Sequence, residues 1–384
     1  LQGLYNPDRI RSPQVTNESG RMVPAGWENA EKALTEKIVE IRQKSPGGKV
    51  VFLSNNVTGS LGSLIDDWMD ALGGEHISYE PFSYEPLKEA NKIVFGTDKI
   101  PSYNIDKANY LLSFGSDFIE TWLSPVEYTR KFSEMHRVKD NSVGKFVYVG
   151  PRASLTGTNA DDWISVKPGT EGVLALGIAN VIMSDGLGGR GVGSAIGGML
   201  RNYTSYNGSK ITGVPEETIK QIAKDFTGMG PSLAIGGGQA SSSTNATETL
   251  VAINILNFVA GNVGETIDFN DSLNVANVNS FGDMAALTES MANGEVSILF
   301  VYDVNPVFTL PPALRFGEAL EKTQFVVSFS RFMDETTEYA NMILPDNHSL
   351  ESWGDYSPRE GVLSLIQPVM TPVFNTKSTG DVIL

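Results

Sequence analysis

Four short turns in the sequence have the composition of phosphate-binding loops. Each follows an apolar run: Gly115-Ser116-Asp117, Gly150-Pro151-Arg152, Gly236-Gly237-Gly238 and Asp303-Val304-Asn305-Pro306. In doubly wound sheets, ligands lie beyond the carboxyl ends of the strands, where small residues let backbone N–H groups approach a phosphate. Glycine in any one of these turns can equally serve only to permit a left-handed backbone conformation. Four such turns at equivalent places predict one extended nucleotide-type groove, either current or ancestral.

Other kinds of chemistry have weaker signals. The three histidines, His76, His136 and His348, are far apart in sequence and show no metal-ligand spacing. We expect His136 to cap a surface helix and His348 to lie near the groove in a structural hydrogen bond. The sequence has no GxSxG motif, P-loop or Ser/His/Asp signature. It therefore predicts no catalytic residue and no metal site.

The elements that must position these turns are helices alternating with buried strands. Apolar runs predict strands at 49–56, 110–115, 145–150, 232–238, 297–304, 324–330 and 340–346. Helical spacing predicts helices at 24–44, 63–74, 126–136, 171–186, 215–228, 245–264 and 311–322. This alternation is typical of parallel sheets covered by helices on both faces. Two such sets, separated by a loop at 261–283, predict an α/β protein with two doubly wound, mostly parallel sheets.

Composition limits the classes of partner. The chain has 384 residues, a formal net charge of −16 and no cysteine. The acidic charge disfavours nucleic acid, and the missing thiols exclude disulfides and thiolate-bound iron–sulfur clusters within these residues. No apolar run approaches the roughly 20 residues of a membrane span. Because the chain starts at Leu1 and stops within the apolar run "GDVIL", we expect it to be a fragment of a longer polypeptide.

The order of motifs resembles the large subunit of the molybdopterin oxidoreductases, the dimethyl sulfoxide reductase superfamily. The matching segments are "LYNPDRIRSP" (4–13), "GWENAEKALTEKI" (26–38), "LLSFGSDFIET" (111–121), the run from "VGPRASLTG" to "GIANVI" (149–182), the run from "GGGQASSST" to "GNVG" (236–264), "VYDVNPVFTLPPA" (301–313) and the run from "TTEYANMILPD" to "REGV" (336–362). The resemblance implies a discontinuous domain, residues 1–80 plus 271–384, with a central domain, residues 81–270, inserted into it. It also implies a groove for a pterin guanine dinucleotide.

The resemblance places the groove residues at Gly115, Ser116, Asp117, Arg152, Gly169, Thr170, Glu171, Gly236, Gly238 and Asn305. Several of them depart from the family pattern. Asp117 replaces an asparagine, and its carboxylate would repel a pyrophosphate. Gly150 replaces an acid suited to a ribose hydroxyl, Asp303 replaces a glycine, and Val362 replaces an arginine. In the region of the family's metal ligand there is no cysteine, and only Ser83 could serve as an alkoxide ligand.

These departures favour a vestigial, cofactor-free version of the fold. The sequence is most similar to the molybdopterin-like domain in the iron–sulfur subunit of alternative complex III, a bacterial quinol-oxidising complex. That similarity implies a non-catalytic scaffold in a respiratory electron-transport complex on a membrane face, expected to be periplasmic. Its partners would be an iron–sulfur ferredoxin-like domain, a multihaem cytochrome c subunit and an integral membrane quinol-binding subunit. Iron–sulfur clusters and haem c would lie in those partners.

Two other hypotheses remain open from the residues alone. One is an active oxidoreductase with molybdenum bis-pterin guanine dinucleotide, in which Ser83 is the metal ligand. The other is a nucleotide-sensing module that uses a surviving half-site around Arg152 and Thr170. Trp122, Trp353 and Tyr356 are expected at partner interfaces, because aromatic residues in loops are enriched there. The same three side chains could instead fill a vacated groove.

Overall fold

The computed structural model describes residues 2–17, 19–138, 141–188, 193–238, 243–275 and 277–384. Contacts between Cα atoms divide the chain into two compact units, residues 1–83 with 277–384 and residues 84–276. We call these unit 1 and unit 2. In the part of the chain that the structure describes, no helix is long and apolar enough to cross a bilayer.

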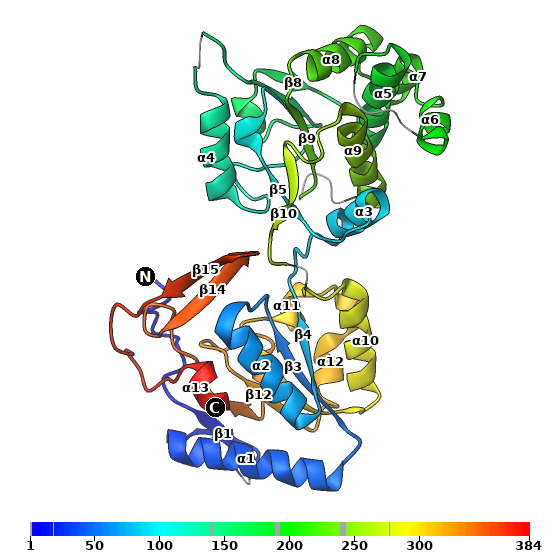
Figure 1. The fold of residues 1–384 in the computed structure, drawn as a ribbon. Helices are drawn as coiled ribbons and strands as arrows, with labels where there is room; N and C mark the ends of the chain where they lie inside the picture. Colours follow the sequence, from blue (N-terminus) through cyan, green and yellow to red (C-terminus); the bar gives the residue numbers. More distant parts are fainter. Residues whose placement is uncertain (1, 18, 139–140, 189–192, 239–242, 276) are drawn as a thin grey trace. The chain divides into compact units, whose positions relative to one another are not determined.

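Unit 1 is built on one mixed sheet (Figure 1). Its strand order is β2-β1-β13-β12-β11-β3-β4, in which β13, β12, β11, β3 and β4 run parallel and β1 pairs antiparallel with both β13 and β2. The strands are β1 (Gln14–Thr16), β2 (Met22–Pro24), β3 (Lys49–Ser54), β4 (Glu75–Ser78), β11 (Val296–Tyr302), β12 (Phe325–Ser328) and β13 (Met342–Ile343). The helices are α1 (Trp27–Lys44), α2 (Gly59–Leu72), α10 (Phe281–Ala292), α11 (Pro306–Thr309), α12 (Phe316–Leu320) and α13 (Thr379–Ile383).

Alternate residues of the central strands of unit 1 enter two separate cores. Phe52 and Phe300 pack with α1, α2 and α13 on one face of the sheet. Leu53 and Leu299 pack with α10 and α12 on the other face. Because successive strand side chains point to opposite faces, an unbroken apolar run is what a sheet covered on both faces requires.

Unit 2 contains a fully parallel sheet of order β8-β7-β6-β9. In Figure 1, α4 lies on one side of this sheet, and α8 and α9 lie on the other. The strands are β5 (Pro101–Tyr103), β6 (Tyr110–Phe114), β7 (Lys145–Val149), β8 (Asp162–Ile164), β9 (Ser232–Gly236) and β10 (Ile267–Ser272), with β5 and β10 forming a separate antiparallel pair. The helices are α3 (Glu85–Phe95), α4 (Pro125–Met135), α5 (Glu171–Ser184), α6 (Ser194–Leu200), α7 (Ser205–Thr212), α8 (Glu216–Gly228) and α9 (Ala246–Ala260). The predicted fold class, with doubly wound and mostly parallel sheets, is confirmed.

The segment after residue 350 has more structure than its sequence indicates. It shows no hydrophobic period, yet it forms the antiparallel ribbon of β14 (Gly354–Arg359) and β15 (Val362–Ile366), followed by α13. Every residue of β15 is exposed. Periodicity cannot reveal such a strand, because no face of it is buried against the rest of the chain.

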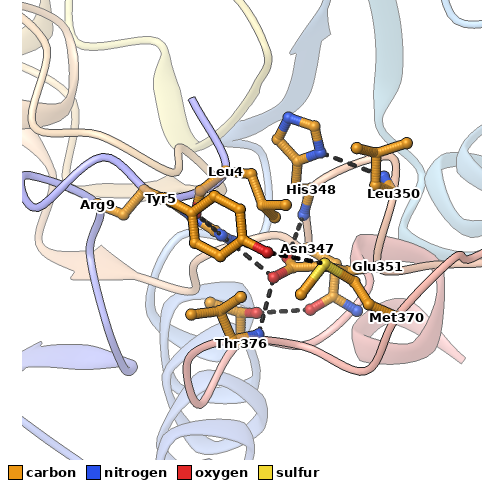
Figure 2. A network of polar contacts seen from close by, with 10 residues as sticks. Leu4, Tyr5, Arg9, Asn347, His348, Leu350, Glu351, Met370 and Thr376 are labelled. Carbon is orange, nitrogen blue, oxygen red and sulfur yellow. Dashed lines mark hydrogen bonds and ion pairs between the residues drawn. The ribbon is translucent and has the colours of Figure 1, made fainter. Parts of the chain in front are cut away.

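A buried ion pair anchors the N-terminal connector of unit 1 (Figure 2). Both terminal nitrogens of Arg9 donate to Glu351, at 3.2 and 2.8 Å, and both side chains are fully buried. The N–H groups of His348 and Val373 also donate to Glu351, each at 2.8 Å. Burial alone would raise the pKa of Glu351, but these hydrogen bonds hold it below its usual range. The pair therefore joins residues that are 342 positions apart in sequence.

We predict that breaking this pair destabilises unit 1 strongly. Arg9→Met and Glu351→Leu should each lower the free energy of unfolding by about 3–5 kcal/mol, because each leaves a buried charge without its partner. The double variant should recover most of that loss. Urea unfolding of the four proteins in a double-mutant cycle measures the coupling. The matched control is the exposed pair Lys32–Glu36, 3.9 Å apart, which should couple by less than about 1 kcal/mol. Equal coupling in both pairs would contradict the prediction.

Candidate cofactor site

The expected ligand crevice of unit 2 lies where its strand order reverses. Strands β6, β7 and β8 add in one direction, and β9 returns to pair with β6 on the other side. Ligands of open α/β sheets bind at this switch point, outside the carboxyl ends of the strands. The structure places two of the four predicted turns there, because Gly115-Ser116-Asp117 follows β6 and Gly236–Gly238 ends β9. The turn at Gly150 follows the neighbouring strand β7.

Trp122 fills the space beside the β9 turn. A Cβ added at Gly237 would lie 3.3 Å from Nε1 of Trp122, and one added at Gly238 would lie 3.1 Å from its Cδ1. The indole also packs on Tyr103 and Tyr128, with ring centroids 5.2 and 5.4 Å away. Its exposed fraction is 1%, so the prediction of an interface role for Trp122 is wrong. The other prediction, that an aromatic side chain fills the groove, matches this position.

Two buried polar atoms near the switch point of unit 2 have no hydrogen-bond partner among the described residues. They are Nε1 of Trp122 and Oγ of Ser116. A buried donor without a partner costs free energy. Because Nε1 of Trp122 has none, a hydrogen bond does not determine the position of the indole. Its aromatic packing and the room left by Gly237 and Gly238 position it instead.

The Asp117 carboxylate accepts hydrogen bonds from donors in the loop after β7. One of its oxygens accepts from the hydroxyl of Ser154 at 3.0 Å and from the backbone N–H of Thr156 at 3.2 Å. Backbone N–H groups and hydroxyls at the ends of strands are the donors that a phosphate would use. Asp117 is therefore an internal anion, and it joins the turn after β6 to the loop after β7.

The glycine in the turn after β7 lies close to the ring of Tyr148. A Cβ at Gly150 would lie 3.0 Å from Cε1 of Tyr148, and one at Gly157 would lie 2.9 Å from Cδ1 of the same ring. A side chain at either position would require the ring of Tyr148 to shift. Arg152 is exposed.

The Pro168-Gly169-Thr170 turn is held by internal hydrogen bonds. The Thr170 hydroxyl donates to the Lys167 carbonyl at 2.7 Å, and the Asn245 amide donates to the Gly169 carbonyl at 2.9 Å. Gly169 has φ +79°, in the left-handed region where glycine is favoured. Glu171 begins α5 and is buried. A Cβ at Gly236 would clash with Cδ1 of Ile253 in α9. Residues 239–242 of this part of the predicted groove lie outside the described residues.

The fourth predicted turn belongs to unit 1, at the end of β11. Asp303 keeps the left-handed backbone of a glycine, with φ +51°. Its carboxylate accepts from Arg331 at 3.0 Å and from the amide of Asn55 at 3.0 Å. Asn305 donates to Glu335 at 2.6 Å and accepts from the Thr336 hydroxyl at 2.7 Å. Because β3 and β11 are the switch-point strands of unit 1, the contact between Asn55 and Asp303 ties its two central strand ends together.

A cavity of about 550 Å³ opens beside this turn, lined by unit 1 residues that include Asn55, Tyr302, Asp303, Arg331 and Asp346. Burial raises the pKa of Asp346 to about 6, although the N–H and hydroxyl of Thr379 both donate to it, at 2.8 and 3.0 Å. Trp353 and Tyr356 also line this cavity, and their exposed fractions are 69% and 45%. Both remain available for an interface.

Unit 1 contains a hydrogen-bonded triad that no motif in the sequence indicates. The Ser54 hydroxyl lies 2.8 Å from Nε2 of His76, whose Nδ1 lies 2.7 Å from Asp66. A serine, a histidine and an aspartate joined in this order also form the catalytic triad of many hydrolases, in which the aspartate is buried and the serine is accessible. Here the serine is buried and the aspartate is exposed. Ser54 has an exposed fraction of 0%, whereas the side chain of Asp66 is 62% exposed. Since no substrate carbonyl can reach a buried hydroxyl, the triad holds β3, β4 and α2 together.

The remaining predicted residues have local roles. His136 ends α4 as its C-cap, and His348 accepts from the N–H of Leu350 at 3.2 Å. Burial, together with Arg331 and Arg9, lowers the pKa of His348, which favours its neutral ring. Ser83 is half-buried in the turn before α3. In the part of the chain that the structure describes, no group of three or more His, Asp or Glu side chains is placed to hold a metal ion.

Comparison with known proteins identifies the family. The profile described as molybdopterin oxidoreductase matches residues 9–383. The chain belongs to the molybdopterin oxidoreductase family.

Curated relatives agree with this assignment, and a solved structure shares the fold. The chain is 26% identical over 401 residues to the menaquinone reductase, molybdopterin-binding-like subunit, of Nitratidesulfovibrio vulgaris, covering 100% of this chain and 57% of that protein. It is 26% identical to the arsenate respiratory reductase molybdopterin-containing subunit of a Shewanella species, covering 98% of this chain and 54% of that protein. Acetylene hydratase from Pelobacter acetylenicus shares the fold, with a TM-score of 0.78 at 18% identity over 100% of this chain and 61% of that one. The chain thus spans little more than half the length of these relatives.

The residues of unit 2 do not fit the dinucleotide that the molybdopterin oxidoreductase family implies. Phosphates need free N–H donors and open space at the switch point. Here Asp117 takes the Thr156 N–H and the Ser154 hydroxyl, and Trp122 occupies the space above Gly237 and Gly238. A pyrophosphate would meet a carboxylate where it needs donors, and like charges repel at such distances.

We predict that removing the Trp122 side chain reopens this space. Trp122→Ala should lower the free energy of unfolding by about 3–5 kcal/mol, because it leaves an apolar cavity. Indole added to this variant should raise its melting temperature, since a ligand that binds only the folded state stabilises it. Thermal melts with and without indole measure both effects. Trp353→Ala, at an exposed site, should lose far less stability and show no response to indole. The absence of an indole response in Trp122→Ala would contradict the prediction.

We predict a pH-dependent stability at Asp346. A folded pKa of about 6 lies above the ordinary value of 3.8, so the contribution of Asp346 to stability is full at low pH and is lost as pH rises through about 6. Asp346→Asn should therefore raise the free energy of unfolding by about 3 kcal/mol at pH 7.5 and by about 1 kcal/mol at pH 4.5. Urea unfolding across this pH range is the measurement. Asp355→Asn is the control of opposite sign, because hydrogen bonds from Ser60 lower the pKa of Asp355. A pH-independent difference at Asp346 would contradict the assignment.

Proposed function

We propose that this chain is a non-catalytic, cofactor-free scaffold within the molybdopterin oxidoreductase family. The observation that carries the proposal is the filled switch point of unit 2, where Trp122 and Asp117 take the space and the donors that a dinucleotide needs. A fold that fills its ligand crevice with its own side chains keeps its architecture without the ligand. Its contribution would then be to position neighbouring redox domains.

The proposal places the chain in a membrane-associated quinol-oxidising complex of the alternative complex III kind. Its relationship to a menaquinone reductase subunit named as molybdopterin-binding-like supports a role in quinone-linked electron transport. Because residues 1–384 contain no cysteine, thiolate-bound iron–sulfur clusters of the complex would have to lie outside these residues. The partners would be an iron–sulfur ferredoxin-like domain, a multihaem cytochrome c subunit and an integral membrane quinol-binding subunit. We propose the periplasmic face of the membrane as the location.

Metal and pterin content of the intact purified complex tests this proposal. We expect less than about 0.1 molybdenum or tungsten atom and less than about 0.1 pterin per chain, measured by elemental mass spectrometry and by fluorescence after pterin oxidation. A molybdenum-loaded family member, prepared in parallel, controls for cofactor loss during purification.

Other outcomes would replace the proposal. One metal and two pterins per chain would show an active molybdenum bis-pterin enzyme, and Ser83→Ala would then test the metal ligand. A stoichiometric nucleotide without metal would instead indicate a binding module around Arg152 and Thr170. Either result would overturn the proposal that the chain is a cofactor-free scaffold.

A further inference from the structure

The cavity of about 550 Å³ in unit 1 carries an excess of acidic side chains. Four carboxylates from separate segments line it, namely Asp303, Asp346, Asp355 in β14 and Asp381 in α13. Among the described residues, Arg331 is the only cationic side chain in this lining, and its guanidinium donates to Asp303 at 3.0 Å. In the part of the chain that the structure describes, the other three carboxylates form no ion pair. The cavity therefore keeps three negative charges that no side chain neutralises.

These three carboxylates can accept further hydrogen bonds. The side chain of Asp381 is exposed and has no hydrogen-bond partner among the residues that the structure describes. Asp355 accepts from the N–H and the hydroxyl of Ser60, and Asp346 accepts from the N–H and the hydroxyl of Thr379. Because an ionised carboxylate offers about four lone-pair sites, both retain free accepting capacity.

The wall of the cavity also contains a buried acceptor without a partner. The Asn55 amide nitrogen donates to Asp303 at 3.0 Å, which fixes the orientation of the amide. Its Oδ1 is buried and has no hydrogen-bond partner among the described residues. Buried polar atoms are nearly always partnered by protein, by water or by a bound group. A lone amide oxygen beside several carboxylates therefore favours a ligand that is positively charged and donates hydrogen bonds.

The remaining wall of the cavity is apolar and aromatic. Leu61 and Leu64 of α2 and Ile366 of β15 line it, together with Trp353 and Tyr356, which are 69% and 45% exposed. Aromatic faces attract cations, and apolar side chains gain stability when they cover methylene groups. A volume of about 550 Å³ is typical of a site for a free small molecule. The ligand that fits this cavity therefore combines hydrocarbon with positive charge.

The arrangement of the carboxylates distinguishes an organic cation from a metal ion. Calcium and magnesium need several oxygen ligands at about 2.0–2.6 Å from one point. In the part of the chain that the structure describes, no group of three or more acidic or histidine side chains is placed in that way. Carboxylates that line one cavity without converging suit a ligand with several separate ammonium groups. Anionic ligands such as phosphates are disfavoured, because like charges repel.

We propose that this cavity of unit 1 binds an aliphatic polyamine as a free small molecule. Its ammonium groups pair with Asp346, Asp355 and Asp381, and its methylene chain packs against Trp353 and Leu61. The net charge of −16 attracts such a cation from solution. The inference goes beyond the scaffold proposal and does not rest on it, since the side chains that carry that proposal belong to unit 2.

Isothermal titration calorimetry of the full-length protein with spermidine tests the site. We expect one spermidine per chain at pH 7.5 and an affinity about tenfold lower at pH 5, because Asp346, with a pKa of about 6, must lose its proton to pair with an ammonium group. Arg331, Asp303, Tyr302 and Asp381 line the same cavity, and Asp346→Asn separates the contribution of Asp346 from theirs. The ammonium groups of spermidine, like that of lysine, stay protonated over this range. The absence of saturable binding would overturn the proposal, as would displacement of spermidine by magnesium chloride at matched ionic strength.

Matched variants separate this site from general attraction to an acidic surface. Asp346→Asn should weaken spermidine binding at least tenfold at pH 7.5 and remove its dependence on pH. Asp67→Asn makes the same change at an exposed position of α2 outside the cavity and should leave the affinity unchanged. Trp353→Ala should weaken binding about threefold through the lost aromatic contact. Circular dichroism and thermal melts verify that each variant is folded.

Equal affinities of Asp346→Asn and Asp67→Asn for spermidine would contradict the proposal, because they would show adsorption to the acidic surface instead of binding in the cavity. That result would leave the metal and pterin content, and hence the scaffold proposal, unaffected.

Discussion

The pairing of β3 with β11 is the constraint on which the rest of the structure depends. Residues 49–54 pair in parallel with residues 296–302, so this contact joins two parts of unit 1 that are separated in sequence by the whole of unit 2. Closing such a long loop has an entropic cost that rises slowly with length, and the two cores on either face of these strands must offset it. The same pairing brings the ends of β3 and β11 together, where Asn55 and Asp303 meet.

The strand ends keep the backbone of a cofactor-binding fold while their side chains make internal contacts. Asp303 retains a left-handed conformation that favours glycine, at a cost of order 1 kcal/mol, and its contacts with Arg331 and Asn55 offset that cost. Asp117 similarly takes donors that a phosphate would use. In both turns a carboxylate from the chain itself satisfies the polar groups of the site.

Buried polar contacts elsewhere are structural rather than catalytic. The pair Arg9–Glu351 joins the two ends of unit 1, and the Ser54–His76–Asp66 triad joins β3, β4 and α2. Each contains groups that could do chemistry in an accessible site. Burial decides the role, because Ser54 and Glu351 are enclosed by protein and meet only their internal partners.

The sequence by itself determined the fold class and the positions of the glycine turns. Buried strands and amphipathic helices leave local periodic signals, and glycine before a helix reports a local backbone requirement. Only the tertiary structure decided what fills the crevice, because Trp122 meets Gly237 and Gly238 across more than a hundred residues. The same holds for the triad at Ser54, whose members come from three different elements. It also holds for β15, which has no buried face and therefore no period to predict it. Side-chain contacts between distant segments depend on how the elements pack, and one sequence does not encode that packing in any local pattern.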